Sequence, residues 1–416
     1  MIRPARRPQI RSVPRPLALL ALLACLGARA QTATAAQGDV LTATAGVTSM
    51  WDDNLFLLPS IATIQPRSDY LIAPYAELKI DKPFSRQVLT VDVLVTDYRY
   101  GHYKGLDFVA PKYGAQWRWA FARHFTGTLS ANGDKALSSF AYFRSGTSGD
   151  VVTTHNERAS LDWWIGGGLH VIGSGFLRSV HNSQRFQQVD SNNQHGARIG
   201  LKYLTEAGSW ITVRFSTSHG DYPTRSLTEQ SVYLLDRRFD RKDTELLMHW
   251  RIDPQLRLQA SAGHLSLTFP DVVARDFSGN YGALRLTWTP LRRLQVELGA
   301  HRRLSQWQDD IASYRASDAV FLSPTWTITH TVSLQVSLQR ERVSFRGHPL
   351  AITPQGLPFR TDHVSTVQVG LDWKPTRNMV ITLSGQDSHR DSGPYAEYFI
   401  YQYSDRIVSL DANISF

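Results

Sequence analysis

Residues 408–416 read VSLDANISF, so that every second side chain from Val408 to Phe416 is apolar and the side chains between them are hydrophilic. Successive side chains of a β-strand point to opposite faces, and this stretch therefore predicts a strand with one apolar and one hydrophilic face. The same alternation recurs at 211–215, 284–288 and 332–338. Past residue 37 no window keeps a helical period, so the sequence predicts an all-β fold.

Strand length and loop length separate two all-β folds. The alternating segments are roughly 10 to 14 residues long, whereas the strands of soluble sandwiches usually have about 5 or 6. Short connections take turns with long polar ones: the short ones are 122–124, 253–255, 290–293 and 375–378, and the long ones include 136–154, 221–240 and 346–361. Outer-membrane barrels show this asymmetry between short periplasmic turns and long outer loops. We therefore favour a transmembrane barrel, with a soluble β-sandwich as the alternative.

Tryptophan placement supports the barrel. Trp119, Trp250, Trp288, Trp326 and Trp373 each come just before a short connection, and three of them are spaced 38 residues apart. Indole rings prefer the membrane interface, where the ring lies in lipid and the N–H meets water. A tryptophan at the same end of many strands is typical of an interfacial girdle.

The 38-residue spacing is also an internal repeat, because residues 284–292 align with 369–377 as a strand, a Trp-x-Pro turn and a returning strand. Counting alternations places nine hairpins near 38–80, 87–122, 124–168, 171–204, 209–252, 255–290, 291–328, 331–374 and 378–416. We expect an antiparallel up-and-down β-barrel of about 18 strands, in the range 16 to 18. Such a barrel is wide enough for a water-filled lumen.

The first 30 residues carry a targeting pattern. They contain six arginines and no acidic residue, then an apolar run at 17–26, then Ala28-Arg29-Ala30. This order is typical of a secretory signal peptide, and the apolar run is shorter than the roughly 20 residues of a membrane-spanning helix. We predict a signal peptide over 1–30 and an outer-membrane barrel over 31–416. In an alternative interpretation Cys25 is the acylated residue of a lipoprotein, although Leu23 fits that pattern poorly.

Removal of this segment changes the charge balance. The chain has 45 Lys and Arg against 36 Asp and Glu, and loss of the six arginines leaves 39 against 36, a net charge of +3. No long basic run remains, so nucleic acid is not a predicted partner. The single cysteine excludes a disulfide framework and a cysteine-based zinc site.

Charged residues on the hydrophilic face are expected to line the lumen. The candidates are Arg118, Arg198, Lys202, Arg214, Arg257, Arg285 and Asp372, accompanied by Glu77, Asp92, Asp162, Glu297 and Asp411. They could form a charged constriction that selects solutes or guides an anionic polymer. Alternatively, they are the mutually neutralised charges that any wide barrel contains. Tyr98, Tyr100 and Tyr103 are expected in an upper aromatic girdle, or else to stack on sugar rings.

Catalytic patterns are absent from the sequence. The 14 histidines are scattered without metal-ligand spacing, and Gly166-Gly167-Gly168 lacks the Gly-Lys-Ser/Thr that completes a phosphate-binding loop. We predict no enzyme activity and no cofactor. A barrel hydrolase with catalytic residues far apart in the sequence stays open as an alternative.

The first predicted strand leads into Asp52-Asp53-Asn54-Leu55-Phe56. Together with the Trp-x-Pro hairpins and the terminal Phe416, this segment resembles the EpsL family of exopolysaccharide-biosynthesis outer-membrane proteins over essentially the whole mature chain. The resemblance implies export of an extracellular polysaccharide across the outer membrane, with other polysaccharide-export components as partners. The terminal aromatic residue resembles the signal that the barrel-assembly machinery reads.

The same segment has a physical interpretation. Its carboxylates and amide can cap a turn where the first strand enters an outer loop, and Leu55 and Phe56 could fold against the lumen wall. The two aspartates could also hold Ca²⁺, although two carboxylates alone make a weak site, and we predict no metal. The leading hypothesis is a non-enzymatic outer-membrane barrel that helps to move a polysaccharide, with outer-membrane lipid, the barrel-assembly machinery and the polysaccharide as partners. A general solute porin is the alternative.

Overall fold

The structure is a computed structural model that describes residues 40–142, 147–185, 187–228, 230, 234–307, 312–347, 359–393 and 400–416. The predicted signal peptide lies outside these residues. Among the described residues no helix is long and apolar enough to cross a membrane.

Eighteen β-strands make up most of the described chain. They are β1 (Val40–Asp52), β2 (Asp69–Phe84), β3 (Gln87–Tyr100), β4 (Phe108–Phe121), β5 (Phe125–Leu137), β6 (Val151–Gly166), β7 (Leu169–Asn182), β8 (Asn192–Leu204), β9 (Trp210–Asp221), β10 (Arg238–Arg251), β11 (Leu256–Thr268), β12 (Phe277–Leu291), β13 (Leu294–Gln306), β14 (Tyr314–Thr327), β15 (Val332–Arg346), β16 (Thr361–Trp373), β17 (Met379–Gly393) and β18 (Tyr403–Ser415). Short 3₁₀ helices between the strands include η1 (Lys104–Leu106), η2 (Gln188–Asp190) and η3 (Val273–Arg275).

The strands form one closed antiparallel sheet. Each strand pairs with the strands next to it in the sequence, and β1 also pairs with β18. At this seam the N–H of Phe416 donates to the carbonyl of Ala43 at 2.8 Å, and the N–H of Ala43 donates back to Phe416 at 3.2 Å. The prediction of an up-and-down barrel of about 18 strands is confirmed.

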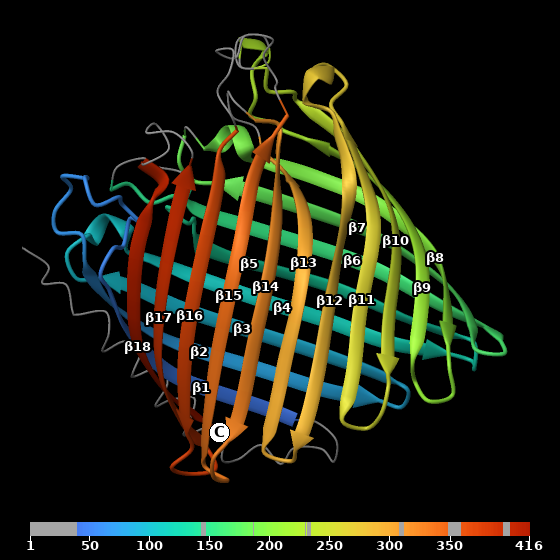
Figure 1. Ribbon diagram of the computed structural model, residues 1–416. Helices are drawn as coiled ribbons and strands as arrows, with labels where there is room; N and C mark the ends of the chain where they lie inside the picture. Colours follow the sequence, from blue (N-terminus) through green and yellow to red (C-terminus); the bar gives the residue numbers. More distant parts are fainter. Residues whose placement is uncertain are drawn as a thin grey trace, which may run out of the picture.

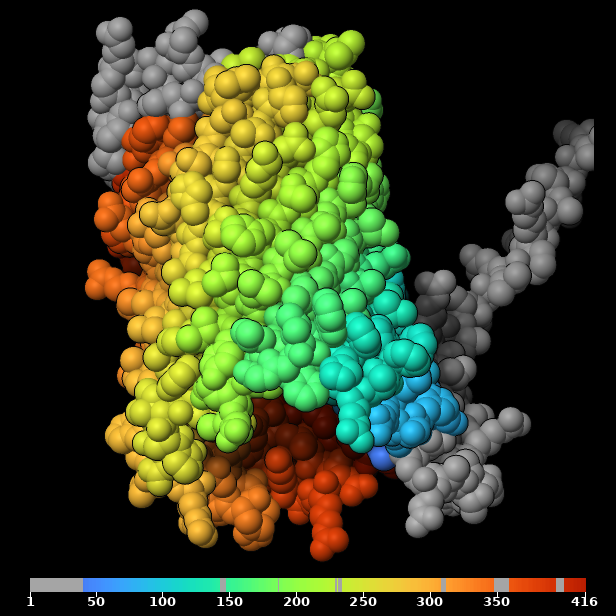
Figure 2. All heavy atoms as spheres, turned by 90° about the vertical axis from the view of Figure 1, so that its right-hand side faces the viewer, coloured from blue at the N-terminus to red at the C-terminus, as the bar shows by residue number. Residues whose placement is uncertain are grey.

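The two ends of the barrel differ. Connections of a few residues, such as Ser85 and Arg86 between β2 and β3, lie at the end that also holds the C-terminus (Figure 1). The opposite end carries the longer loops, including 53–68 and 138–150. Figure 2 shows the end with the short turns hollowed, with atoms of the last strands visible inside it. The predicted alternation of short and long connections therefore corresponds to the two rims of the barrel.

One face of the sheet is an apolar surface directed away from the barrel. Exposed side chains on this face include Ile199 and Leu201, at 62% and 61% of their full accessibility. On β10 this face runs from Trp250 through Leu246 to Lys242. Eight residues of tilted strand span about 20 Å along the barrel axis, close to the apolar band of an outer-membrane barrel. So much exposed apolar surface suits lipid and not water.

The predicted tryptophan girdle lies on the same outward face. Trp250, Trp288, Trp326 and Trp373 are between 36% and 49% exposed, and each comes just before a short turn. They mark the periplasmic edge of the apolar band.

Two turns show why the sequence bends where it does. Gly168 closes the turn between β6 and β7 with φ of +81°, where a Cβ would lie 2.4 Å from the carbonyl oxygen of Leu204. At the predicted 290–293 turn, β12 instead continues through Pro290 to Leu291, with an irregular register between Trp288 and Leu291. Proline has no N–H to donate to the neighbouring strand, so pairing is lost there before the chain turns.

Candidate functional site

A contact across the barrel identifies the inner face of the sheet. Arg390 of β17 donates from Nη1 to the carbonyl of Ala141, in the loop between β5 and β6, at 2.8 Å. Six strand-to-strand steps separate β5 from β17 around the sheet. Two elements that far apart can meet only through the lumen, so the face of β17 that carries Arg390 is the inner face.

At Ala141 and Tyr142 the connection between β5 and β6 therefore reaches into the lumen near its outer end. Its Tyr142 ring lies 4.4 Å from the guanidinium of Arg390 and 4.8 Å from that of Arg315 on β14. Trp307 packs edge-on against the same ring, with centroids 5.3 Å apart. We call Tyr142, Arg315 and Arg390 the Tyr142 clasp. Because β5 and β14 lie on opposite sides of the barrel, this loop narrows the passage between them.

A buried ion cluster holds the clasp in place. Asp362 is fully buried and accepts bonds from Arg360 Nε at 2.9 Å and from Arg390 Nε at 3.1 Å. The Arg360 guanidinium also stacks over the ring of Tyr401 at 3.4 Å. The Asp362 carboxylate thus orients both arginines. Because one carboxylate neutralises only one of the two guanidinium charges, the aromatic rings around them stabilise the other.

The first outer loop folds as its sequence predicts. The N–H of Asn54 donates to Asp52 Oδ1 at 2.8 Å, and Asn54 Oδ1 accepts from the N–H of Leu58 at 2.9 Å. These bonds cap the turn that leaves β1. Phe56 is only 1% exposed and packs edge-on against Tyr103 and Phe140, with ring centroids 4.7 Å and 4.9 Å away.

The structure corrects the position of the tyrosines near this loop. Tyr98, Tyr100 and Tyr103 do not form an outer girdle. Tyr100 is buried in the cluster around Phe56, with Tyr98 and Tyr103 packed against it. Their strand and loop direct them inward because the first outer loop supplies an apolar surface inside the barrel, which the alternation pattern alone does not reveal.

A second buried cluster lies beneath the loop between β9 and β10. Tyr222 is 2% exposed, and burial raises its pKa to about 12. The Arg225 guanidinium stacks on its ring at 3.4 Å and donates to the carbonyl of Val189, in the preceding outer loop, at 2.6 Å. The long loops of this rim are therefore packed onto one another and onto the barrel.

Each of five consecutive strands carries an arginine on the inner face. We call them the arginine wall: Arg158, Arg178, Arg198, Arg214 and Arg241, on β6 to β10. The strand register places Arg158 and Arg241 on one row, Arg178 two residues nearer the long loops, and Arg198 and Arg214 two and four residues nearer the short turns. The positive charges thus form a ladder along the barrel axis.

Only part of this charge is neutralised. Arg241 binds Asp243 through Nε at 2.8 Å, and Arg214 binds Glu245. In the part of the chain that the structure describes, Arg158, Arg178 and Arg198 form no ion pair. Next to the ladder, Asp162 accepts from Lys202 at 3.1 Å and from His170.

The arginine wall is hollowed. Arg158, Arg178, Arg198 and Arg241 line a cavity of about 540 Å³ together with serine, asparagine and glutamine side chains. Arg158, Arg198, Arg214 and Arg118 line a second one of about 590 Å³ nearer the short turns. A small solute at either position would meet several guanidinium groups at once.

The opposite wall has a different chemistry. Its inner face carries hydroxyl groups that bond to one another, as between Ser323 and Ser337 at 3.1 Å and between Ser384 and Ser409 at 2.7 Å. We call the part of this inner face that lies between the Tyr142 clasp and the short turns, on β14 to β18, the hydroxyl wall. Asp372 on this wall accepts bonds from Thr382 and Ser333, at 2.8 Å and 3.4 Å, and forms no ion pair within the described residues.

The sequence-predicted candidates lie in several groups. Arg118, Arg198, Lys202 and Arg214 lie on β4, β8 and β9 beside the cavities of the arginine wall. Arg285 on β12 lies 3.9 Å from Glu297 and over the ring of Phe321. Arg257 on β11 and Asp372 on β16 are separate from that group. A role of these side chains in selection stays a prediction.

Sequence reasoning missed several inward residues. Arg158, Arg178 and Arg241 follow the same parity as the candidates and could have been found by extending it along their strands. The contact between Arg390 and the loop at Ala141 had no such signal, because it joins residues 249 positions apart.

The closed sheet, its outward apolar band and its polar interior define the class: the chain is an outer-membrane β-barrel. No family model and no curated protein matches the sequence. Among solved structures the fold is similar to that of Pseudomonas aeruginosa OccK2 (OpdF) in complex with glucuronate, with a TM-score of 0.51, 8% identity, and coverage of 91% of this chain and 99% of that one. It is also similar to Acinetobacter baumannii OccAB3, with a TM-score of 0.50, 10% identity, and coverage of 90% and 99%.

Proposed function

We propose that this barrel is a passive channel for small hydrophilic solutes that carry a carboxylate. The observation that carries the proposal is the arginine wall, in which Arg158, Arg178 and Arg198 have no acidic partner in the described chain. Guanidinium groups bind carboxylates with paired hydrogen bonds, and a ladder of them provides successive sites of similar strength. Conduction requires several sites of similar strength, because a solute must bind well enough to enter the channel and weakly enough to leave it.

The opposite wall supports the same function. Hydroxyl groups can bond to the hydroxyl groups of a sugar or sugar acid without discriminating by charge. A solute that passes between the two walls would therefore turn its carboxylate toward the arginine wall and its neutral side toward the hydroxyl wall. The structural similarity to OccK2, which was solved with glucuronate, suits this chemistry, since glucuronate is a sugar that carries one carboxylate.

Planar-bilayer recordings of the purified chain test the proposal. Under a salt gradient we expect a reversal potential that indicates anion preference, and glucuronate should block or carry current more effectively than neutral glucose. A cation-selective pore, or equal responses to glucuronate and glucose, would refute the proposal.

Export of an exopolysaccharide is a second candidate, favoured by the Asp52-Asp53-Asn54-Leu55-Phe56 segment. A polymer rich in uronic acids would present the same carboxylates to the arginine wall. Deletion of the gene should then abolish surface polysaccharide while its precursors are still made. Unchanged surface polysaccharide, together with anion-selective conductance, would leave the solute channel as the function.

A further inference from the structure

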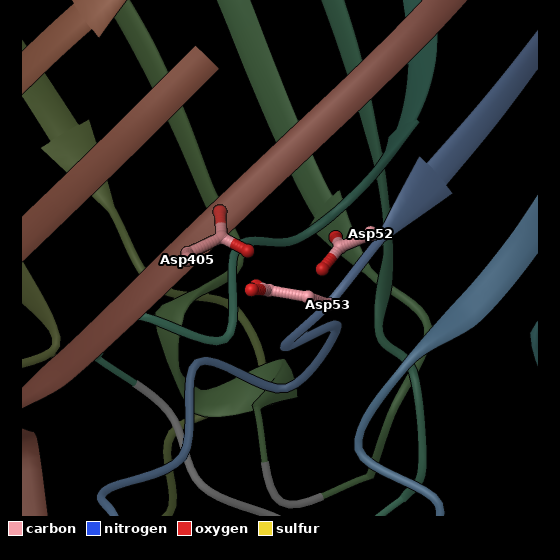
Figure 3. Close-up of side chains that lie close together, drawn as sticks. All are labelled: Asp52, Asp53 and Asp405. Carbon is pink, nitrogen blue, oxygen red and sulfur yellow. The ribbon is translucent and has the colours of Figure 1, made fainter. Parts of the chain in front are cut away.

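We propose that Asp52, Asp53 and Asp405 bind one Ca²⁺ ion at the outer end of the seam between β1 and β18. Asp52 is the last residue of β1, Asp53 begins the first outer loop, and Asp405 belongs to β18. Their three carboxylates point toward one another (Figure 3). One oxygen from each lies within 4.8 Å of the other two. This inference is independent of what the channel carries.

The spacing suits calcium. Ca²⁺ binds carboxylate oxygens at about 2.4 Å, so two ligands on opposite sides of the ion are about 4.8 Å apart and adjacent ligands about 3.4 Å apart. Three oxygens that all lie within the larger separation can therefore contact one ion. Water can complete a coordination shell of six to eight oxygens.

Backbone hydrogen bonds hold two of the carboxylates. Asp52 Oδ1 accepts from the N–H of Asn54 at 2.8 Å, and Asp53 Oδ1 accepts from the N–H of Arg406 at 2.7 Å. Within the described residues no donor reaches the Oδ2 atom of either residue. The loop and β18 thus orient both side chains while leaving one oxygen of each for an ion.

Asp405 provides the independent sign that a ligand is required. The residue is 4% exposed, and within the described residues its buried Oδ1 accepts no hydrogen bond. Asp52 beside it is 7% exposed. A buried carboxylate oxygen without a donor is costly, and two buried carboxylates side by side require a shared proton or a cation.

Basic side chains do not supply that cation. In the described part of the chain none of the three aspartates forms an ion pair, and the Arg406 guanidinium turns to Asp387 at 3.0 Å. The neighbouring Asp69 is a useful contrast, because it accepts from the N–H groups of Tyr70, His102 and Tyr103. Backbone amides stabilise that carboxylate, whereas the three-aspartate cluster lacks a comparable set of donors.

Bound calcium would join the first outer loop to the last strand. The loop that begins at Asp53 places Phe56 in the buried cluster at the outer mouth. The ion would hold this loop in the folded position and reduce opening at the seam.

Calorimetric titration of CaCl₂ into the full chain tests the proposal, with the protein stripped by EGTA in a non-ionic detergent free of lipopolysaccharide. We expect one site in the wild type and at least about tenfold weaker binding in Asp405→Asn, which removes a charged ligand. Asp387→Asn is the matched control, because this exposed acid pairs with Arg406 on the same part of the sheet, and it should bind calcium like the wild type.

Thermal unfolding provides the second measurement. Calcium should raise the unfolding temperature of the wild type and leave that of Asp405→Asn unchanged. In EGTA the variant should unfold at a higher temperature than the wild type, because it lacks one of the repelling charges. If Asp405→Asn does not fold, Asp53→Asn in the loop is tested in the same way. Equal calcium binding by the wild type and the folded variant, or no calcium response of the wild type, would overturn the proposal in favour of a shared proton.

Discussion

The arginine wall and the hydroxyl wall are built from the same strand pattern and face each other across one lumen, but they stabilise their polar groups differently. On the hydroxyl wall, Ser384 and Ser409 satisfy each other, and Asp372 is held by hydroxyl donors. On the arginine wall, Arg158 and Arg198 have no acidic partner among the described residues. A wall that only supports the barrel needs its charges neutralised by neighbouring side chains. A wall with unneutralised charges of one sign can bind a mobile ion of the opposite sign. The difference between the walls thus indicates which one acts on the solute.

Charge reversal on the arginine wall should have the largest effect. In the triple variant Arg158→Glu, Arg178→Glu and Arg198→Glu, no ion pair of the described chain is broken, so the barrel should fold. One unit charge at 4 Å in water changes the energy of an ion by about 1 kcal/mol, and we expect the anion-to-cation permeability ratio to fall at least about tenfold. Reversal potentials in a salt gradient measure this permeability ratio. Arg340→Glu, on the outward face of β15, is the control, and a comparable shift in that variant would contradict the assignment.

The second-largest effect is expected when the Asp362 carboxylate, which orients the Tyr142 clasp, is removed. Asp362→Asn leaves Arg360 and Arg390 buried without their anion, a change that typically costs about 3–5 kcal/mol. We expect the loop 138–150 to detach, which would increase single-channel conductance and expose the loop to protease. Asp387→Asn, which removes an exposed partner of Arg406, should leave both properties unchanged. A variant that is destabilised but conducts like the wild type would show that the loop does not narrow the passage.

Neutralising a single arginine of the arginine wall should have a moderate effect. Arg198→Gln keeps a hydrogen-bond donor and removes one charge, so glucuronate block should weaken by roughly threefold, less than 1 kcal/mol of interaction energy. Concentration-dependent block in bilayers measures this. An unchanged blocking constant would indicate that glucuronate does not approach β8.

The smallest effect is expected on the hydroxyl wall. Ser384→Ala removes one hydrogen bond with Ser409, which contributes about 1 kcal/mol to stability or less. Selectivity and glucuronate block should match the wild type, and a small decrease in unfolding temperature should be the main change. A shift in selectivity as large as that of Arg198→Gln would mean that the two walls do not differ in function.

Local patterns in the sequence were sufficient for the barrel itself. The alternation in 408–416 and its repeats follows from the strict two-residue period of a strand in a sheet with one lipid face, and the nine predicted hairpins correspond to the 18 strands. The candidates Arg198 and Arg214 could be placed on the hydrophilic face by the same parity.

Contacts between distant segments could not be derived in this way. The bond between Arg390 and Ala141 joins residues 249 positions apart, and Asp405 meets Asp52 across the seam between the last strand and the first. Such contacts depend on the conformation of the outer loops, and a polar loop sequence has no hydrophobic period from which its conformation could be predicted. The carboxylate pair of Asp52 and Asp53 was visible in the sequence, whereas the third carboxylate required the closed seam.

The seam between β1 and β18 has a consequence for biogenesis. β18, which completes the sheet, follows the other 17 barrel strands in the chain, and Phe416 pairs with Ala43 near the start of β1. Until that pairing forms, both terminal strands keep a row of unsatisfied amides and carbonyls that lipid cannot hydrate. Insertion should therefore proceed as a late, all-or-none event, in which a chain cut before β18 is degraded in the periplasm and does not persist as a smaller pore.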